Sequence, residues 1–158
     1  MIRITKQTDY GIVLLSHLAA QPGRLFTAPE LASEAGLPLP MVSKILKALA
    51  RQQLLRSQRG VKGGYCLALA PEEISIARVI EAIEGPIGIT ECIDDAPGHC
   101  GLAEVCGVRS NWNRINQAIR EALDQISLTE MSSNAAPPQL VTLGGGGKDA
   151  DGASVATR

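Results

Sequence analysis

The sequence contains no apolar stretch long enough to cross a membrane. A membrane-spanning helix needs about 18 or more consecutive, mostly uncharged apolar residues. No such run is present, and the first residues, MIRITKQTDYG, lack the apolar block and small-residue cleavage site of a secretory signal. We therefore expect a cytoplasmic protein that has no membrane partner.

A second absence concerns catalysis. The four cysteines include no C-x-x-C pair, which is the motif of thiol oxidoreductases, and no signature of a substrate pocket is evident. We therefore predict that the chain is not an enzyme. Its 158 residues, of which 45% are hydrophobic, are enough for one compact domain and too few for two substantial ones.

Charge is unevenly distributed along the chain. The net charge is only -1, but residues 1–70 carry nine Lys/Arg against three Asp/Glu, a net +6, and the remainder carries six against thirteen, a net -7. A basic half can supply phosphate contacts to nucleic acid, whereas an acidic half would face away from it. The alternative is a chance division of solvated charges. The sequence motifs are needed to distinguish nucleic-acid binding from this alternative.

Apolar spacing and capping signals predict three helices in the basic half. The first should cover residues 6–20. Thr27 and Glu30 have the spacing of a capping box, which predicts the start of a short second helix that Gly36 ends. The segment LPLP at residues 37–40 leads into the third helix, because the first turn of a helix accepts proline.

The third helix should have one apolar and one basic face, and a basic hairpin should follow it. The apolar stripe consists of Val42, Ile45, Leu46 and Leu49, and the opposite face of Ser43, Lys44, Lys47 and Arg51. Residues 54–58 and 65–69 alternate like short strands around a Gly-rich tip. This order is that of a winged helix-turn-helix, so the predicted fold is mainly α with a small β-hairpin wing.

Such an arrangement suits double-stranded DNA. The major groove admits one helix, and the hairpin can reach the neighbouring backbone or the minor groove. We predict Ser43, Lys44 and Lys47 at the major groove and Arg59 and Lys62 on the wing, with Arg59 as the best candidate for a narrow minor groove. For any single lysine, the alternative is the solvated side of an amphipathic helix.

The C-terminal half divides into a helix, a cysteine segment, a second helix and a tail. Ser75 can cap a helix that Gly85 and Pro86 end. From Trp112 an apolar seam with steps of 3 and 4 residues favours pairing with a twin helix. The predicted divisions are a DNA-binding domain at 1–86, a cysteine loop at 87–108, a dimerisation helix at 109–130 and a disordered tail at 131–158.

Three of the four cysteines lie close together. Cys92, Cys100 and Cys106 follow the pattern C-x7-C-x5-C. Three thiolates can converge on one centre, and thiolates select iron-sulfur clusters, zinc or copper(I) over hard cations. A redox-active thiol pair, or three cysteines without a shared role, are the alternatives. Cys66 lies in a predicted wing strand and is interpreted as a small buried hydrophobe.

The fourth ligand of such a centre is ambiguous. His99 is the nearest candidate, but it neighbours Cys100, so both would have to turn toward the same centre. Possible oxygen donors, each of which can equally be a solvated carboxylate, are Glu91, Asp94, Asp95 and Glu104. His17, the other histidine, lies near the apolar side of the first helix and is interpreted as structural.

Several motifs together resemble one bacterial family. They are ITKQTDY at residues 4–10, GGY at 63–65, VIEAIEGP at 79–86 and the three cysteines that follow. Over residues 1 to about 130 the chain is similar to the iron-sulfur winged-helix regulators typified by IscR and NsrR, and most similar to the regulators of the SUF cluster-assembly operon. The resemblance implies a homodimer joined through the C-terminal helix, a DNA operator bound by the recognition helix and wing, and a cluster beside the DNA-binding domain.

The resemblance also bears on the fourth ligand. IscR-like proteins place a histidine three residues after the third cysteine, where this chain has Arg109. NsrR-like proteins take an aspartate from helix 1 of the partner subunit, and Asp9 occupies the matching position. The resemblance therefore makes Asp9 the first candidate and His99 the second. Because the first cysteine gap is two residues longer than in IscR, the cluster type stays open between 2Fe-2S, which is favoured, and 4Fe-4S.

Overall fold

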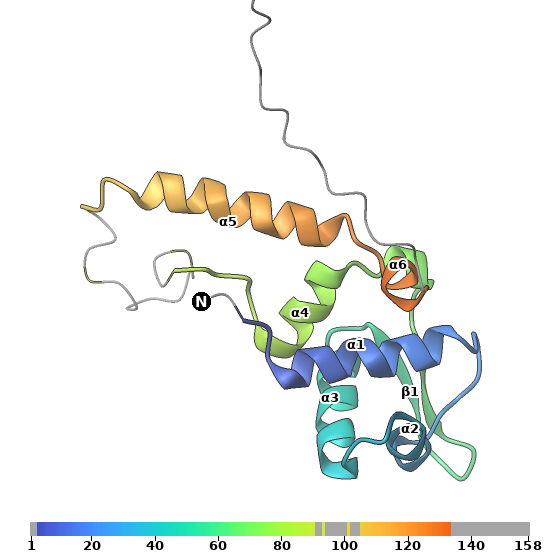
Figure 1. Cartoon of the computed structure of the whole chain (residues 1–158). Coiled ribbons are helices and arrows are strands. Elements are labelled where there is room, and N and C mark those ends of the chain that lie inside the picture. Colours follow the sequence, from blue (N-terminus) through green and yellow to red (C-terminus); the bar gives the residue numbers. More distant parts are fainter. Residues whose placement is uncertain (1–2, 91–92, 94–100, 102–104, 134–158) are drawn as a thin grey trace, which may run out of the picture.

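The computed structural model describes residues 3–90, 93, 101 and 105–133 (Figure 1). Its elements in chain order are α1 (Lys6–Ala19), α2 (Ala28–Ala35), α3 (Leu39–Arg51), β1 (Leu55–Gln58), β2 (Gly64–Leu67), η1 (Pro71–Glu73), α4 (Ile76–Glu84), α5 (Arg109–Asp124) and α6 (Leu128–Ser132). Helices α1 to α3 and the β1–β2 hairpin form a winged helix-turn-helix, and α5 lies apart from α2 and α3, beyond α1 and α4 (Figure 1). The described part is mainly α with a small β-hairpin wing, as predicted.

The helices begin at the capping residues that the sequence indicates. Glu30 N donates to the Thr27 side chain, and Thr27 N donates to the Glu30 carboxylate at 2.7 Å, which completes the capping box of α2. This helix ends at Gly36, whose φ of 64° is a left-handed conformation that glycine adopts without strain. Ser75 caps α4 by accepting a hydrogen bond from Arg78 N. These signals are local, so they define the helix ends independently of the tertiary fold.

The wing is an antiparallel hairpin that a third segment extends. Strands β1 and β2 pair over their full lengths. Phe26, in the loop between α1 and α2, adds a bridge to β2: its N–H donates to Tyr65 O at 3.0 Å, and Tyr65 N–H donates to Phe26 O at 2.8 Å. A Cβ at Gly64 would lie 2.7 Å from the Phe26 carbonyl oxygen, so this close approach requires glycine.

One apolar core connects the wing to the helices. Its side chains come from α1, α2, α3, α4 and α6 and from the loops between them; the largest that are fully buried are Phe26, Leu14, Leu15, Leu18, Leu31, Ile45, Leu46, Leu49, Leu54, Ile74, Leu128 and Val42. Each such burial contributes about 1.5–3 kcal/mol. No helix in the described ranges has the length and apolar character needed to cross a membrane.

The C-terminal helix differs from the prediction. The seam pattern predicts one helix over residues 109–130, but a break separates α5 from α6. Ser127 caps α6 in a capping box with Glu130, and Leu128 is fully buried. Leu128 N donates to Ile74 O at 2.8 Å, which holds the break against the start of α4. A local cap and a tertiary contact therefore outweigh the helical periodicity at this point.

Helix α6 packs on α1. Since the sequence predicts the disordered tail to begin at residue 131, the first residues of that tail fall within α6. Residues 134–158, the rest of the predicted tail, lie outside the described residues.

Candidate nucleic-acid interface and cysteine segment

Helix α3 presents the polar side chains expected of a recognition helix. Lys44 and Lys47 are exposed and Ser43 is half-buried, whereas the opposite face of α3 lies in the core. A short turn through Gly36 joins α2 to α3. The polar face of α3 is therefore free to enter a groove that admits one helix.

A groove of about 450 Å³ lies between the helix-turn-helix and the wing. One wall consists of Thr27 and Ala28 at the start of α2 and of Lys47 in α3, and the other of Ser57, Gln58, Arg59, Gly60, Gly63, Gly64 and Tyr65. The start of a helix carries a partial positive charge, so the groove combines it with the cations of Lys47 and Arg59. The sequence did not indicate that Thr27, Ala28 and Tyr65 line this groove, because the long-range bridge between Phe26 and Tyr65 brings them together.

The cations of this surface have no acidic partner among the described residues. The ion pairs in that part of the chain join His17 to Glu34, Arg24 to Glu30 and Arg120 to Glu81. On this surface Lys44, Lys47, Arg59 and Lys62 are exposed and have no ion-pair partner among the described residues. Such side chains can bind phosphate without first losing an intramolecular partner, and binding releases counterions from the nucleic acid.

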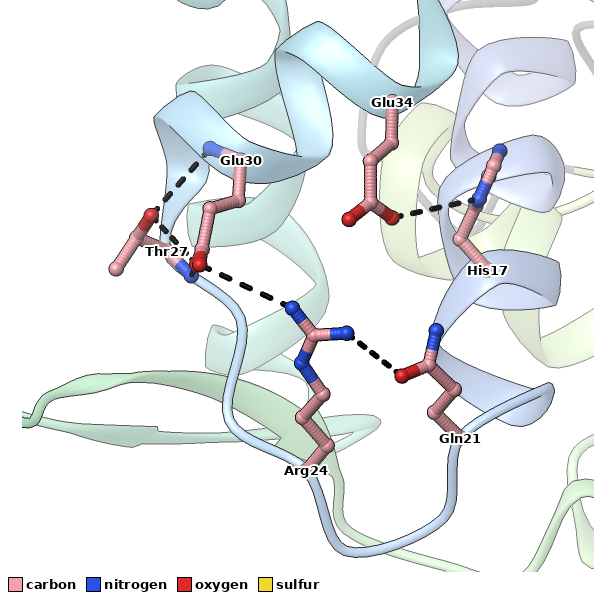
Figure 2. Close-up of polar contacts among 6 residues, drawn as sticks. All are labelled: His17, Gln21, Arg24, Thr27, Glu30 and Glu34. Atoms are coloured by element: carbon pink, nitrogen blue, oxygen red, sulfur yellow. Dashed lines mark hydrogen bonds and ion pairs between the residues drawn. The ribbon is translucent and has the colours of Figure 1, made fainter.

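A polar network connects the start of α2 to the loop that extends the wing (Figure 2). Arg24 donates to Gln21 Oε1 at 2.6 Å, lies 3.9 Å from Glu30 Oε1 and stacks over the Phe26 ring at 4.2 Å. Hydrogen bonds from the backbone and side chain of Thr27 lower the pKa of Glu30, so this carboxylate is charged at neutral pH. The network therefore helps to set the position of one wall of the groove.

His17 joins α1 to α2. Its Nδ1 lies 4.0 Å from the Glu34 carboxylate, and both side chains are partly exposed (Figure 2). Exposed pairs of this kind contribute about 0–1 kcal/mol. The structural role of His17 therefore stays a prediction.

The predicted cysteine site lies largely outside the described residues. This applies to the predicted ligands Cys92, Cys100 and His99 and to the possible oxygen donors Glu91, Asp94, Asp95 and Glu104. Cys106 is described: its thiol is free and half-buried, and its carbonyl accepts a hydrogen bond from Arg109 N at 3.3 Å at the start of α5. Within the described ranges, no three metal-ligating side chains come together.

The chemistry of the donor set nevertheless fits an iron-sulfur cluster. The set consists of three thiols in one segment, and thiolates are the ligands that hold such clusters. Cys106 lies just before the first turn of α5, so the last thiol of the segment is close to a fixed helix end. Cys66 is half-buried in β2 opposite Arg56 and is not part of this segment.

Asp9 lies on the exposed face of α1. It lines a groove of about 430 Å³ together with Ile12, Val13, His17, Met131 and their neighbours. No hydrogen bond or ion pair joins the Asp9 carboxylate to another described residue. Its carboxylate is therefore available to a group from outside this surface.

Helix α5 carries an apolar stripe that is open to solvent in the single chain. Trp112 and Ile115 are 38% and 46% exposed, and Ile126, just beyond the helix, is 38% exposed. Exposed apolar side chains on one face of a helix are typical of a contact with another protein. Arg109, which stands where IscR-like proteins have their histidine, is the first residue of α5 and is exposed.

Comparison with known sequences points to one family. A family model named Rrf2, described as an iron-dependent transcriptional regulator, matches residues 4–134. The HTH-type transcriptional regulator NsrR of Bacillus subtilis is 29% identical over 134 residues, which cover 84% of this chain and 92% of NsrR.

Solved structures give the same fold. CymR, described as the global cysteine regulator of B. subtilis, is 28% identical and superposes with a TM-score of 0.65 over 86% of this chain and 100% of CymR. IscR of T. potens is 25% identical and superposes with a TM-score of 0.59 over 82% of this chain and 85% of IscR.

Proposed function

This chain belongs to the Rrf2 family of DNA-binding transcriptional regulators, and from that premise we propose that it senses iron-sulfur or redox status through a bound cluster and controls SUF-type cluster-assembly genes. Family membership alone does not define the signal, because a solved relative is described as a cysteine regulator. The observation that carries the proposal is the C-x7-C-x5-C segment directly ahead of α5.

On DNA, α3 enters the major groove and the wing reaches the neighbouring minor groove. Ser43, Lys44 and Lys47 contact base edges and phosphates, and Arg59 and Lys62 contact the adjacent backbone or groove. The groove between α2 and the wing receives a phosphate, because the start of α2, Lys47 and Arg59 attract negative charge there. The surface of unpaired cations supports this arrangement.

Two copies of the chain form a homodimer through α5. The exposed stripe at Trp112, Ile115 and Ile126 is the surface that a twin helix covers. A dimer of recognition helices reads two half-sites on one face of the duplex, about 34–36 Å apart or a multiple of that. The operator is therefore expected to be near-palindromic.

Cys92, Cys100 and Cys106 would hold the cluster, with the partner subunit's Asp9 as the first candidate for the fourth ligand and His99 as the second. When bound, the cluster, 2Fe-2S or 4Fe-4S, supplies a centre that redox conditions can alter or remove. Asp9 is exposed and unpaired on α1, and α1 packs directly on α3. If Asp9 binds the cluster, the cluster-bound and cluster-free states have different contacts next to the recognition helix. A switch requires such a difference.

Single substitutions Cys92→Ala, Cys100→Ala and Cys106→Ala test the cluster. We expect the anaerobically reconstituted wild-type chain to have a visible absorption band with iron and sulfide, and each variant to lose most of both, because three thiolates share the centre. Cys66→Ala is the matched control and should keep them.

The same experiment tests a second function, that of a zinc-stabilised or metal-free protein-interaction module. Its support is the donor chemistry, because thiolates also bind zinc. A colourless anaerobic chain that contains zinc and no iron would favour it, and an equal loss of iron in Cys66→Ala would rule out the predicted ligand set.

A further inference from the structure

Helix α5 buries one side chain, and that side chain is polar. Asn116 is 8% exposed, whereas every other residue of α5 is half-buried or exposed. Burying a carboxamide is costly unless its donors and acceptor are bonded. The burial of Asn116 therefore indicates specific partners.

Those partners are backbone groups of the segment that leads from α4 to the cysteines. Asn116 Nδ2 donates to Ile87 O at 2.8 Å, and its Oδ1 accepts from Ile89 N at 3.2 Å. The side-chain amide thus pairs with this backbone as a neighbouring strand would. An aspartate could only accept and a leucine could do neither, so the contact is specific for an amide.

The position of this contact matters for the cysteine segment on both sides. Ile89 precedes Cys92 by three residues, which span at most about 10 Å when fully extended. Cys106 lies just before α5, and Asn116 lies about 10 Å along the helix from Arg109, at about 1.5 Å a residue. The described residues on both sides of the cysteine segment, Ile89 ahead of Cys92 and Arg109 after Cys106, are therefore held on the same helix.

We propose that Asn116 is a positioning residue for the cysteine site. It ties the chain ahead of Cys92 to the helix that follows Cys106, so that both thiols extend from points held on one scaffold. Holding these points removes part of the entropy cost of closing the intervening segment. The consequence for the cluster rests on the proposed function, but the positioning of the two thiols does not.

Asn116→Leu tests the positioning in the metal-free protein, because leucine has a similar size and removes both hydrogen bonds. Asn113→Leu, on the exposed side of the same helix, is the matched control. Both are placed in a chain that carries Cys66→Ala and Cys100→Ala, so that Cys92 and Cys106 are the remaining thiols. Dibromobimane becomes fluorescent when it joins two thiols, and a denaturing gel separates bridges within one chain from bridges between chains.

We expect Asn116→Leu to slow bridging within the chain about fivefold or more relative to Asn113→Leu, because Ile87 and Ile89 are no longer bonded to α5. Asn116→Asp, which keeps the acceptor and loses the donor, should slow it by a smaller factor. Circular dichroism and thermal unfolding should report intact helices in all three. Equal bridging rates in Asn116→Leu and Asn113→Leu would overturn the inference, whether or not a cluster forms.

The second arm measures cluster lifetime in chains that keep all four cysteines. After anaerobic reconstitution, Asn116→Leu should lose iron to a chelator about tenfold faster than the wild type or Asn113→Leu, as is typical when a residue supporting the ligands is removed. An unchanged rate of loss counts against the inference. If the wild-type chain takes up no iron, the proposed function fails instead, and the bridging rate alone decides the role of Asn116.

Discussion

Replacing Lys47 and Arg59 together with alanine is expected to weaken binding to an operator duplex about a hundredfold or more, since each lost contact costs about 1–3 kcal/mol. The two side chains face one groove from opposite walls, and neither has an acidic partner among the described residues. If both contact phosphate, the slope of log affinity against log salt should fall by about 0.9 for each contact removed.

The measurement is a titration at several salt concentrations with a duplex that the wild-type chain selects from a random-sequence pool. Arg78→Ala with Arg114→Ala is the control, because it removes the same charge from exposed positions on α4 and α5. An equal loss of affinity in this control would mean that net charge, and not the groove, governs binding. Unchanged affinity in the Lys47 and Arg59 variant would contradict the predicted interface.

Replacing Glu84 with alanine is expected to lower the free energy of unfolding by about 2 kcal/mol. Glu84, the last residue of α4, accepts at Oε1 hydrogen bonds from the backbone N and the Oγ1 of Thr5, both at 3.0 Å, and from the hydroxyl of Thr8. Thr8 is fully buried. Removing the carboxylate therefore loosens the start of α1 and deprives a buried hydroxyl of its acceptor. The expected change is modest because Glu84 itself is exposed.

This contribution should depend on pH. Partial burial raises the pKa of Glu84, but the hydrogen bonds from Thr8 and Thr5 outweigh it, so the net pKa lies below the ordinary glutamate value. A group whose pKa is lower in the folded state stabilises the protein above its unfolded pKa and loses that effect as the pH falls through the folded pKa. The stability difference between wild type and Glu84→Ala should therefore be full at neutral pH and shrink in acid.

Urea unfolding of the metal-free chains at neutral and acidic pH measures both effects. Glu72→Ala is the control, since Glu72 is exposed and no hydrogen bond or ion pair joins it to another described residue. Glu30 and Glu130 also have lowered pKa values from their capping boxes, but they are present in every variant and cancel in the difference. A difference that is absent at neutral pH, or constant down to strongly acidic pH, would contradict the assigned role of Glu84.

Features set by neighbouring residues were predictable from the sequence. The capping box at Thr27 and Glu30, the left-handed Gly36 and the cap at Ser75 appear where expected, because each depends on contacts within one turn. The two faces of α3 were predictable for the same reason, since helical spacing alone separates Lys44 and Lys47 from the buried stripe.

Features that join distant residues were not predictable. The bridge between Phe26 and Tyr65, the contact of Glu84 with Thr5 and the pairing of Asn116 with Ile87 each join residues that are far apart in the sequence. The break between α5 and α6 was missed because the apolar seam continues through it, whereas α5 ends at Asp124 and Ser127 caps the start of α6. For the cysteine site, the ligand types follow from the sequence, whereas Cys92, Cys100 and His99 lie outside the described residues.

The proposed cluster at Cys92, Cys100 and Cys106 would control the affinity of the dimer for DNA. The most direct test is the anaerobic affinity of the wild-type chain for its selected duplex before and after removal of the cluster, with Cys92→Ala treated in parallel. We expect the affinity of the wild type to change about tenfold or more, as is typical for coupled sites, and that of Cys92→Ala to stay the same. Equal affinities of the loaded and cluster-free wild type would contradict it.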